Sequence, residues 1–113
     1  MNEERKRRIA LNEAVFRQVN DRLDELNRGF ATITENVDLV CECGDLDCTD
    51  RIVMTSDEYE ELRSDPTRFA VIPDHVFPDT EDLIEDRGHY QVVEKHLGLP
   101  SDVARATDPR DGD

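Results

Sequence analysis

Three cysteines lie close together near the middle of the chain, and they are the residues best suited to bind a metal. They occupy the stretch Cys41-Glu-Cys-Gly-Asp-Leu-Asp-Cys48, and the 113-residue sequence has no cysteine outside it. Thiolates are soft ligands that zinc binds in a tetrahedron. Residues two apart on a strand point to one face, so Cys41 and Cys43 can converge, and Gly44 allows the reversal that brings Cys48 back. We therefore expect a zinc site, with one ion per chain.

A closed structural zinc site needs a fourth ligand, and His75 is the residue that we expect. It follows Pro73 directly after a predicted strand, and a loop fixed by proline can deliver an imidazole. The other histidines, His89 and His96, fall at a predicted turn and at a strand end, where exposure to solvent is the usual outcome. The alternatives are water or a nearby carboxylate: Asp45, Asp47 or Asp74.

The composition fits a small domain that needs such a metal. Charged residues make up 37% of the chain and hydrophobic residues 36%, with no tryptophan. Proteins with little apolar surface to bury often depend on a metal for stability. We expect one domain with appendages: an amphipathic helix over residues 1–30, a zinc-stabilised body over 31–98, and an acidic, disordered tail over 99–113. Within the tail, residues 101–106 could form a helical turn, and the last seven residues are the part expected to be disordered.

The net charge of −14 is unevenly distributed. Residues 1–28 carry seven Lys/Arg and six Asp/Glu, whereas the rest of the chain carries seven and 22. Nucleic acids bind basic surfaces, so we expect no direct nucleic-acid binding and, if there is a partner, a basic protein. The basic run 5–8 adjoins Glu3 and Glu4 and is interpreted as a solvated helix end.

The cysteine count also bears on the cellular compartment. Three thiols within eight residues do not suit a secreted disulfide framework, and they favour a reducing compartment. There is no run of 18 apolar residues and no apolar segment after the basic start, so we expect neither a membrane span nor a signal peptide. The sequence thus predicts a cytoplasmic protein.

Heptad spacing predicts a long helix over residues 3–28, with Gly29 as its stop. The seam contains one polar residue, and it could pair two copies in a coiled coil or pack on the chain's own sheet. A homodimer would use Ile9, Phe16, Val19, Leu23 and Leu26, and Leu11 and Val15 widen the stripe. The whole predicted seam is Ile9, Asn12, Phe16, Val19, Leu23, Leu26 and Phe30.

Further elements must position the metal ligands. Strands over 37–43 and 51–55 form a hairpin with the cysteines at its tip. Thr55 and Glu58 form a capping box that starts a helix over 56–63, with Tyr59 and Leu62 inward. A strand over 69–72 stops at Pro73. Residues 81–95 predict a second hairpin, with a short helix over 80–85 as the alternative. The fold class is α+β: a long helix followed by a small antiparallel body.

The chain resembles a group of short uncharacterised actinobacterial proteins. The resemblance rests on the cysteine stretch 41–48 followed by Pro73-Asp-His75, on a helix like Asn12 to Asn20, and on an ending like Val92 to Lys95. It covers most of residues 5–95. It implies that the three cysteines and His75 act as one set, and it implies no activity.

These features favour a zinc-stabilised interaction or regulatory module, not an enzyme. One alternative is a thiol redox switch, in which oxidation of the cysteines expels zinc. Another is a zinc hydrolase with water in the fourth position. The hydrolase is disfavoured because three thiolates make zinc a poor Lewis acid. A calcium loop at Asp45-x-Asp47 is excluded, since its sixth position is Asp50 and its twelfth is Ser56.

Overall fold

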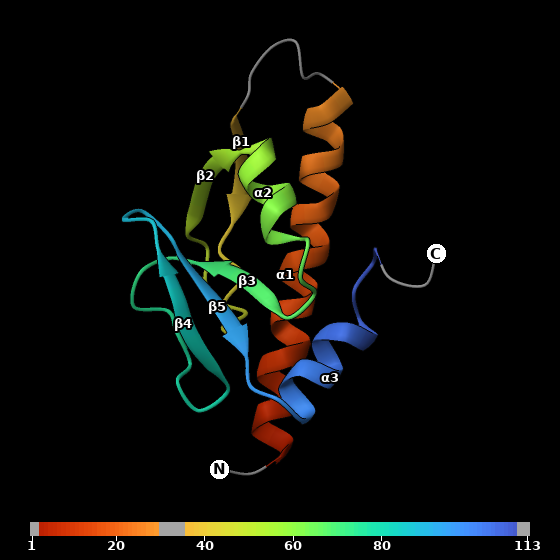
Figure 1. Cartoon of the computed structure of the whole chain (residues 1–113), viewed down its shortest axis with the longest axis vertical. Coiled ribbons are helices and arrows are strands. Elements are labelled where there is room, and N and C mark those ends of the chain that lie inside the picture. The colour runs from red at the N-terminus through yellow and green to blue at the C-terminus, as the bar shows by residue number, and fades with distance from the viewer. Residues whose placement is uncertain (1–2, 30–35, 111–113) are drawn as a thin grey trace.

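One long helix runs beside the whole body of the molecule (Figure 1). A computed structural model describes residues 3–29 and 36–110. Helix α1 spans Glu3–Gly29, as predicted, and its 27 residues make it about 40 Å long at 1.5 Å per residue. The longest dimension of the chain is 46 Å. None of the helices in these ranges has the length and apolarity needed to cross a membrane.

The first hairpin carries the cysteines at its tip, as the sequence predicted. Strand β1 (Asn36–Val40) pairs antiparallel with β2 (Arg51–Thr55). The predicted strand over 37–43 is too long, because β1 ends at Val40. The hydrogen bonding between the two strands nevertheless continues one bond beyond Val40, since the Cys41 N–H donates to the Asp50 carbonyl at 3.0 Å. Alternate residues face the core: Val37, Leu39, Ile52 and Met54.

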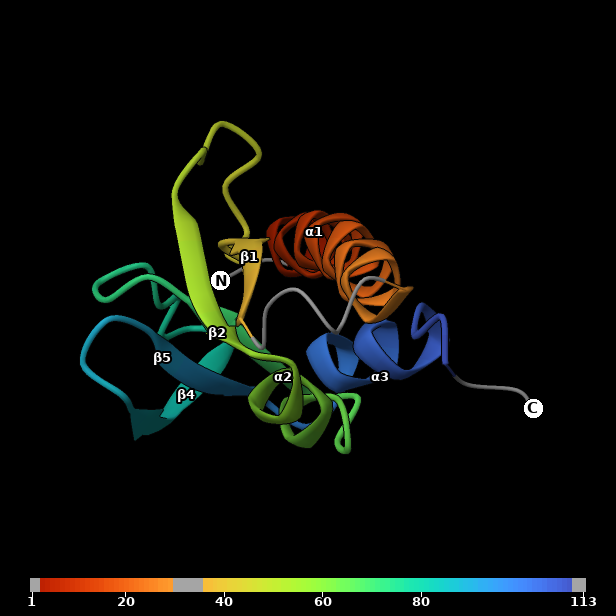
Figure 2. The same cartoon turned by 90° about the horizontal axis from the view of Figure 1, so that it is seen from above.

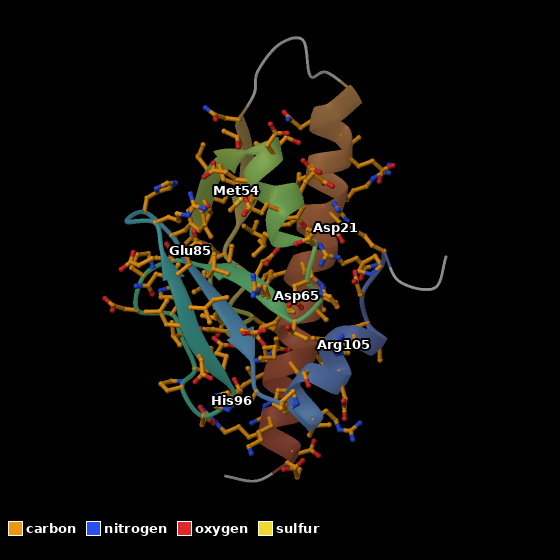
Figure 3. All side chains as sticks on the ribbon, viewed as in Figure 1. Asp21, Met54, Asp65, Glu85, His96 and Arg105 are labelled. Carbon is orange, nitrogen blue, oxygen red and sulfur yellow. The ribbon has the colours of Figure 1, made fainter. Side chains whose placement is uncertain are left out.

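A second sheet has the order β3-β5-β4, all antiparallel. Its strands are β3 (Arg68–Val71), β4 (Glu81–Asp86) and β5 (Gln91–Lys95). The predicted second hairpin is therefore confirmed, and the alternative helix over 80–85 is wrong. Strand β5 is central and buries Val92 and Val93, whereas β4 is an outer strand on which Glu85 lies (Figure 3).

Helix α2 (Ser56–Leu62) begins at the predicted capping box. The Thr55 hydroxyl accepts from the Glu58 N–H at 3.0 Å, and the Glu58 carboxylate accepts from the Thr55 N–H at 2.8 Å. Tyr59 and Leu62 are buried, as expected. The two sheets and α2 together form an α+β body against α1, which confirms the predicted fold class.

The prediction of which face of α1 is buried is only partly right: Ile9 is buried and Leu23 packs against the core, but other members of the seam are exposed. Val19 and Leu26, two members of the predicted seam, are 42% and 48% exposed, as are Leu11 at 44% and Val15 at 51%. Much of the buried face is polar, because its side chains form hydrogen bonds with groups elsewhere in the body. A prediction from hydrophobic periodicity does not take such bonds into account. Phe30 lies outside the described residues. The buried side chains of α1 are Ile9, Ala10, Glu13, Ala14, Arg17, Asn20 and Asp24.

Two buried polar residues show how α1 is attached. The Asn20 side-chain amide behaves like a neighbouring strand, since it donates to the Val40 carbonyl and accepts from the Val40 N–H, both at 2.8 Å. The Arg17 guanidinium donates to the carbonyls of Pro66 at 2.6 Å and Ala104 at 2.7 Å. It also lies over the Phe69 ring, 4.7 Å from its centroid. These bonds join α1 to both sheets and to the C-terminal segment.

The disorder predicted for residues 99–113 is wrong as far as residue 110, where the described part ends. Helix α3 (Leu99–Ala106) packs beside α1, as seen from two directions (Figures 1 and 2). Beyond α3, Arg110 forms a bidentate ion pair with Glu60, and each of the two nitrogen–oxygen distances is 2.9 Å. The acidic composition predicted a solvated tail, but here the charges serve as ion-pair partners.

Candidate metal centre

The four predicted ligands lie together at one end of the first hairpin. Cys41 and Cys43 follow β1, Cys48 precedes β2, and His75 follows β3. Their ligand atoms all lie within 4.8 Å of one another. A Cys3His cluster of this kind could hold a metal ion. It forms only because β3 is placed against the tip of the hairpin, so the set joins both sheets.

The separations within the cluster fit a tetrahedral ion. The Sγ atoms of Cys41 and Cys48 each lie 3.6 Å from Nδ1 of His75. In a tetrahedral zinc site with Zn–S near about 2.3 Å and Zn–N near about 2.0–2.1 Å, the sulfur–nitrogen edge is about 3.6 Å. These two sulfur–nitrogen separations thus match zinc coordination, within a set of ligand atoms that spans up to 4.8 Å.

Groups behind the ligands hold them in orientation. The Ile72 N–H donates to Sγ of Cys41 at 3.2 Å. Nε2 of His75 lies 3.5 Å from the Asp50 carboxylate, while Nδ1 faces the thiols. A carboxylate on the far nitrogen of a metal-binding histidine fixes the ring and its tautomer. The position of Asp50 on the far side of the ring suits Nδ1 as the ligand atom.

A tight turn delivers His75 to the thiols. The His75 N–H donates to the Ile72 carbonyl at 3.0 Å, closing a four-residue turn with Pro73 at its second position. Asp74 at the third position has φ of 74°, in the left-handed region. Proline second and a positive φ third define a type II turn. The rigid loop expected from Pro73 is present in this form.

Gly44 attaches the cysteine loop to α1 by close approach. A Cβ on Gly44 would lie 2.5 Å from Cγ2 of Ile9, so no side chain fits there. The Asn12 side chain donates to the Gly44 carbonyl at 2.8 Å, which satisfies a buried acceptor at this contact. The sequence predicted Gly44 for its backbone freedom. The structure adds a second requirement, which is contact with a helix some thirty residues earlier.

Glu42 is a residue of the site that sequence reasoning missed. It lies between two cysteines in an acidic loop, where a solvated carboxylate is expected, yet it is fully buried. Its N–H donates to the Ala70 carbonyl at 2.8 Å, and its carboxylate accepts from the Ala70 N–H at 3.0 Å and from Asn20 at 2.8 Å. Burial raises the pKa of Glu42, against the opposing effect of these donors. Glu42 thus joins the cysteine loop to β3 and to α1.

The three thiols differ electrostatically when no metal is bound. A hydrogen bond from Cys41 lowers the pKa of Cys43 to about 5. The same bond, together with burial, raises the pKa of Cys41, and burial raises that of Cys48. The cluster alone therefore favours one thiolate at neutral pH. A bound cation would be needed to keep all three ionised.

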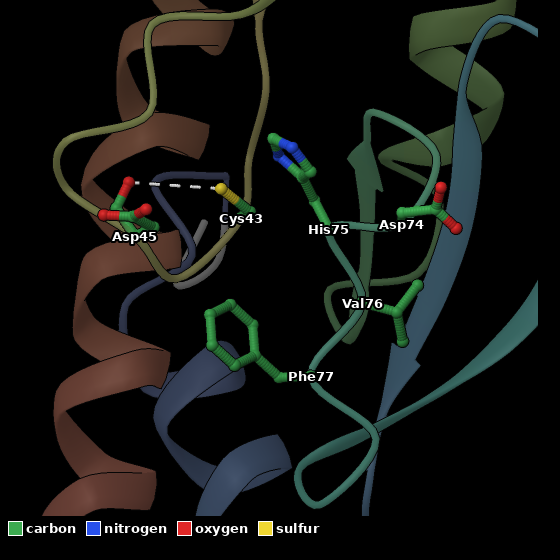
Figure 4. A pocket seen from close by; sticks show the side chains of 6 residues that line it. All are labelled: Cys43, Asp45, Asp74, His75, Val76 and Phe77. Carbon is green, nitrogen blue, oxygen red and sulfur yellow. Dashed lines mark hydrogen bonds between the residues drawn. The ribbon is translucent and has the colours of Figure 1, made fainter.

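The alternative fourth ligands do not join the cluster. Figure 4 shows the Cys43 and His75 side chains facing a common space, with the Asp74 carboxylate pointing away from it. His89 contacts the Val53 carbonyl at 2.8 Å, and His96 contacts Asp82 at 3.1 Å, so neither is near the thiols. Asp45 and Asp47 bond to each other, with the Asp47 N–H donating to the Asp45 carboxylate at 2.9 Å.

A cavity of about 220 Å³ adjoins the site and is lined by Cys43, Asp45, Asp74, His75, Val76 and Phe77.

Comparison with known proteins adds no further constraint on the site. No protein-family model matches the sequence, and neither a curated protein nor a solved structure matches it. The functional argument therefore depends on the geometry and chemistry of the chain itself.

Proposed function

We propose that this chain is a zinc-binding interaction module in which the metal has a structural role. The observation that carries the proposal is the convergence of four protein donors, Cys41, Cys43, Cys48 and His75, within 4.8 Å. Four protein ligands complete a tetrahedron, whereas a catalytic zinc keeps one position for water. Zinc held in this way would join the first hairpin to the turn after β3 and so stabilise the contact between the two sheets.

The outer face of α1 is the surface that we assign to interaction. It carries an exposed apolar stripe and a groove of about 540 Å³ that is bounded by Val15, Val19, Arg22 and Pro109. The occupant that we propose is α1 of a second copy, since a stripe of this kind on a long helix suits helix pairing. Ile9 belongs to the contact with Gly44 and lies outside this surface, whereas Leu23 both packs against the core and borders the groove. The stripe is formed by Leu11, Val15, Val19 and Leu26.

Native mass spectrometry of freshly reduced, full-length protein tests the metal. We expect one zinc per chain. Cys43→Ser should lose it, and His75→Ala should bind it more weakly. Asp47→Ser is the matched control, because Asp47 is an exposed residue of the same loop and is not in the ligand set. Metal-free protein from cells grown with ample zinc would contradict the proposal.

A thiol redox switch is the second candidate function, and the unequal exposure of the cysteines favours it. Cys48 is half-buried, whereas Cys41 and Cys43 are buried. An oxidant could thus reach Cys48 first. Peroxide would convert two thiolates into a disulfide and release the zinc, and a thiol reductant would restore binding. Zinc retention under mild peroxide would contradict the switch and leave the structural role intact.

A further inference from the structure

Three side chains from distant parts of the chain meet in a buried ionic cluster away from the cysteines. Lys95 of β5 donates to the carboxylates of Glu13 on α1 at 2.5 Å and Glu81 on β4 at 2.9 Å, and to the Thr80 hydroxyl at 3.1 Å. These three bonds use all the hydrogens of the ammonium group. The side chains of Glu13, Glu81 and Lys95 are completely excluded from solvent.

The charges in this cluster do not balance if every group is ionised. Two carboxylates and one ammonium leave an excess negative charge in a site without water contact. Glu81 and Lys95 are the charged groups that act on Glu13 most strongly, from β4 and β5 respectively. A buried charge without a partner is costly, and proteins usually avoid it by changing the protonation of the group.

The hydrogen bonds distinguish the two carboxyl groups. Oε1 of Glu81 accepts from Lys95, and its Oε2 accepts from the Phe77 N–H at 3.1 Å, which suits an ionised carboxylate. Oε1 of Glu13 also accepts from Lys95, but its Oε2 is buried and has no hydrogen-bond donor. A carboxyl group with such an unpartnered buried oxygen costs less when it is protonated, because it then carries no charge.

We propose that Glu13 binds a proton at neutral pH, so that the Glu13–Glu81 pair presents one negative charge to Lys95. Burial first, and the negative charge of Glu81 second, raise the pKa of Glu13 well above its ordinary value. The proton is thus a ligand of the folded state, and it links α1 to the β4–β5 hairpin.

Protonation of Glu13 in the folded state determines the direction in which the stability of the protein changes with pH. A carboxyl group whose pKa is raised on folding stabilises the protein while it is protonated, and that stability is lost as pH rises through the folded-state pKa. Raising the pH above neutrality should therefore loosen the contact of α1 with β4 and β5.

Carboxyl ¹³C NMR of the zinc-loaded, full-length protein, labelled at glutamate, tests the proposal. At pH 7 we expect the Glu13 resonance to have the chemical shift of a protonated acid and to titrate at a higher pH than the exposed glutamates. Glu13→Gln should remove that resonance, and it should also remove the loss of stability at high pH, because an amide keeps the donor without a charge. The control is Glu85→Gln, an exposed site on β4, which should change neither.

The wild-type spectrum decides the question even if Glu13→Gln fails to fold. Ionised shifts for every glutamate at pH 7 would overturn the proposal. Folded Glu13→Gln that keeps every protonated resonance of the wild type would also overturn it, since the proton would then belong to another residue, such as Glu42, whose pKa burial also raises.

Discussion

A Cβ atom on Gly44 would lie 2.5 Å from Cγ2 of Ile9, so the loop that carries Cys43 lies directly on α1. Gly44→Ala should force this contact apart and destabilise the protein by about 1–3 kcal/mol, as overpacked interiors do. Urea unfolding of the zinc-loaded protein measures the change.

The double variant Gly44→Ala/Ile9→Ala is the control for this contact. Removal of Cγ2 relieves the clash, so the two substitutions together should cost less than the sum of their separate effects. Additive costs would mean that the cysteine loop is not held by this approach to α1.

Zinc removal should destabilise the body more than α1. Structural zinc binding contributes on the order of 10 kcal/mol at neutral pH, and in a body this small that exceeds the net balance of burial against chain entropy. Amide exchange with and without a chelator should show lost protection over residues 37–95, including the Ile72 N–H that bonds to Cys41. Part of α1 should stay protected. Equal protection in both states would show that the body folds without the metal.

The buried ion pair that joins α1 to the end of α2 should stabilise the fold far more than an exposed ion pair does. The Arg63 guanidinium donates to both oxygens of Asp21, at 2.8 and 3.0 Å, and the Tyr59 hydroxyl donates to the same carboxylate at 2.6 Å. Figure 3 shows Asp21 on the side of α1 that faces α2. Asp21→Ala removes these bonds and leaves Arg63 with the Asp108 carboxylate as a remaining partner, so it should cost about 1.5–3 kcal/mol, the range of hydrogen bonds to charged groups.

The matched control is Asp38→Ala, which removes an exposed carboxylate 3.6 Å from Arg51. Exposed pairs contribute about 0–1 kcal/mol, so this change should have little effect. Thermal unfolding of both variants provides the comparison. Similar losses would show that burial does not set the strength of these pairs.

The capping box at α2 should make part of the stability depend on pH. A hydrogen bond from the Thr55 N–H is the largest effect that lowers the pKa of Glu58. Ionised Glu58 therefore contributes stability above its ordinary pKa, and this is lost as pH falls through the lowered folded value. Glu58→Gln should be less stable than the wild type at pH 7, and the difference should shrink on acidification.

Urea unfolding at several acidic pH values at which both proteins still fold measures this difference, and comparing the two proteins cancels the effect of protons on the thiols. Thr55→Ala, which removes the other half of the box, should cost about 1 kcal/mol. A difference between Glu58→Gln and the wild type that is constant with pH would contradict the assigned role.

The outer face of α1 should control self-association. Val19 is 42% exposed, so Val19→Asp should leave the fold intact and convert a dimer into a monomer. Leu23 packs against the core, and Leu23→Asp should instead destabilise each chain. Light scattering at high concentration, with circular dichroism to confirm folding, separates these effects. A monomeric wild-type protein would remove the second copy as the partner of this face.

The sequence by itself determined the local elements. The capping residues Thr55 and Glu58, the stop at Gly29 and the alternation in β1 depend on neighbours within a few positions. The candidate ligand set was also predictable, because three thiols in eight residues and a histidine after a proline turn restrict the chemistry to few outcomes. His75 was separated from other candidates by its Pro73 loop, and the structure places it among the thiols.

Only the tertiary structure decided which face of α1 is buried and how α1 and α3 are joined to the body. Glu13, Arg17 and Asn20 are polar, so periodicity assigns them to solvent. Each is buried because its partner is supplied by another element: Lys95 for Glu13, Ala104 for Arg17 and Val40 for Asn20. Burial of a polar side chain depends on whether a matching group is present across the contact, and residue type and local spacing do not carry that information.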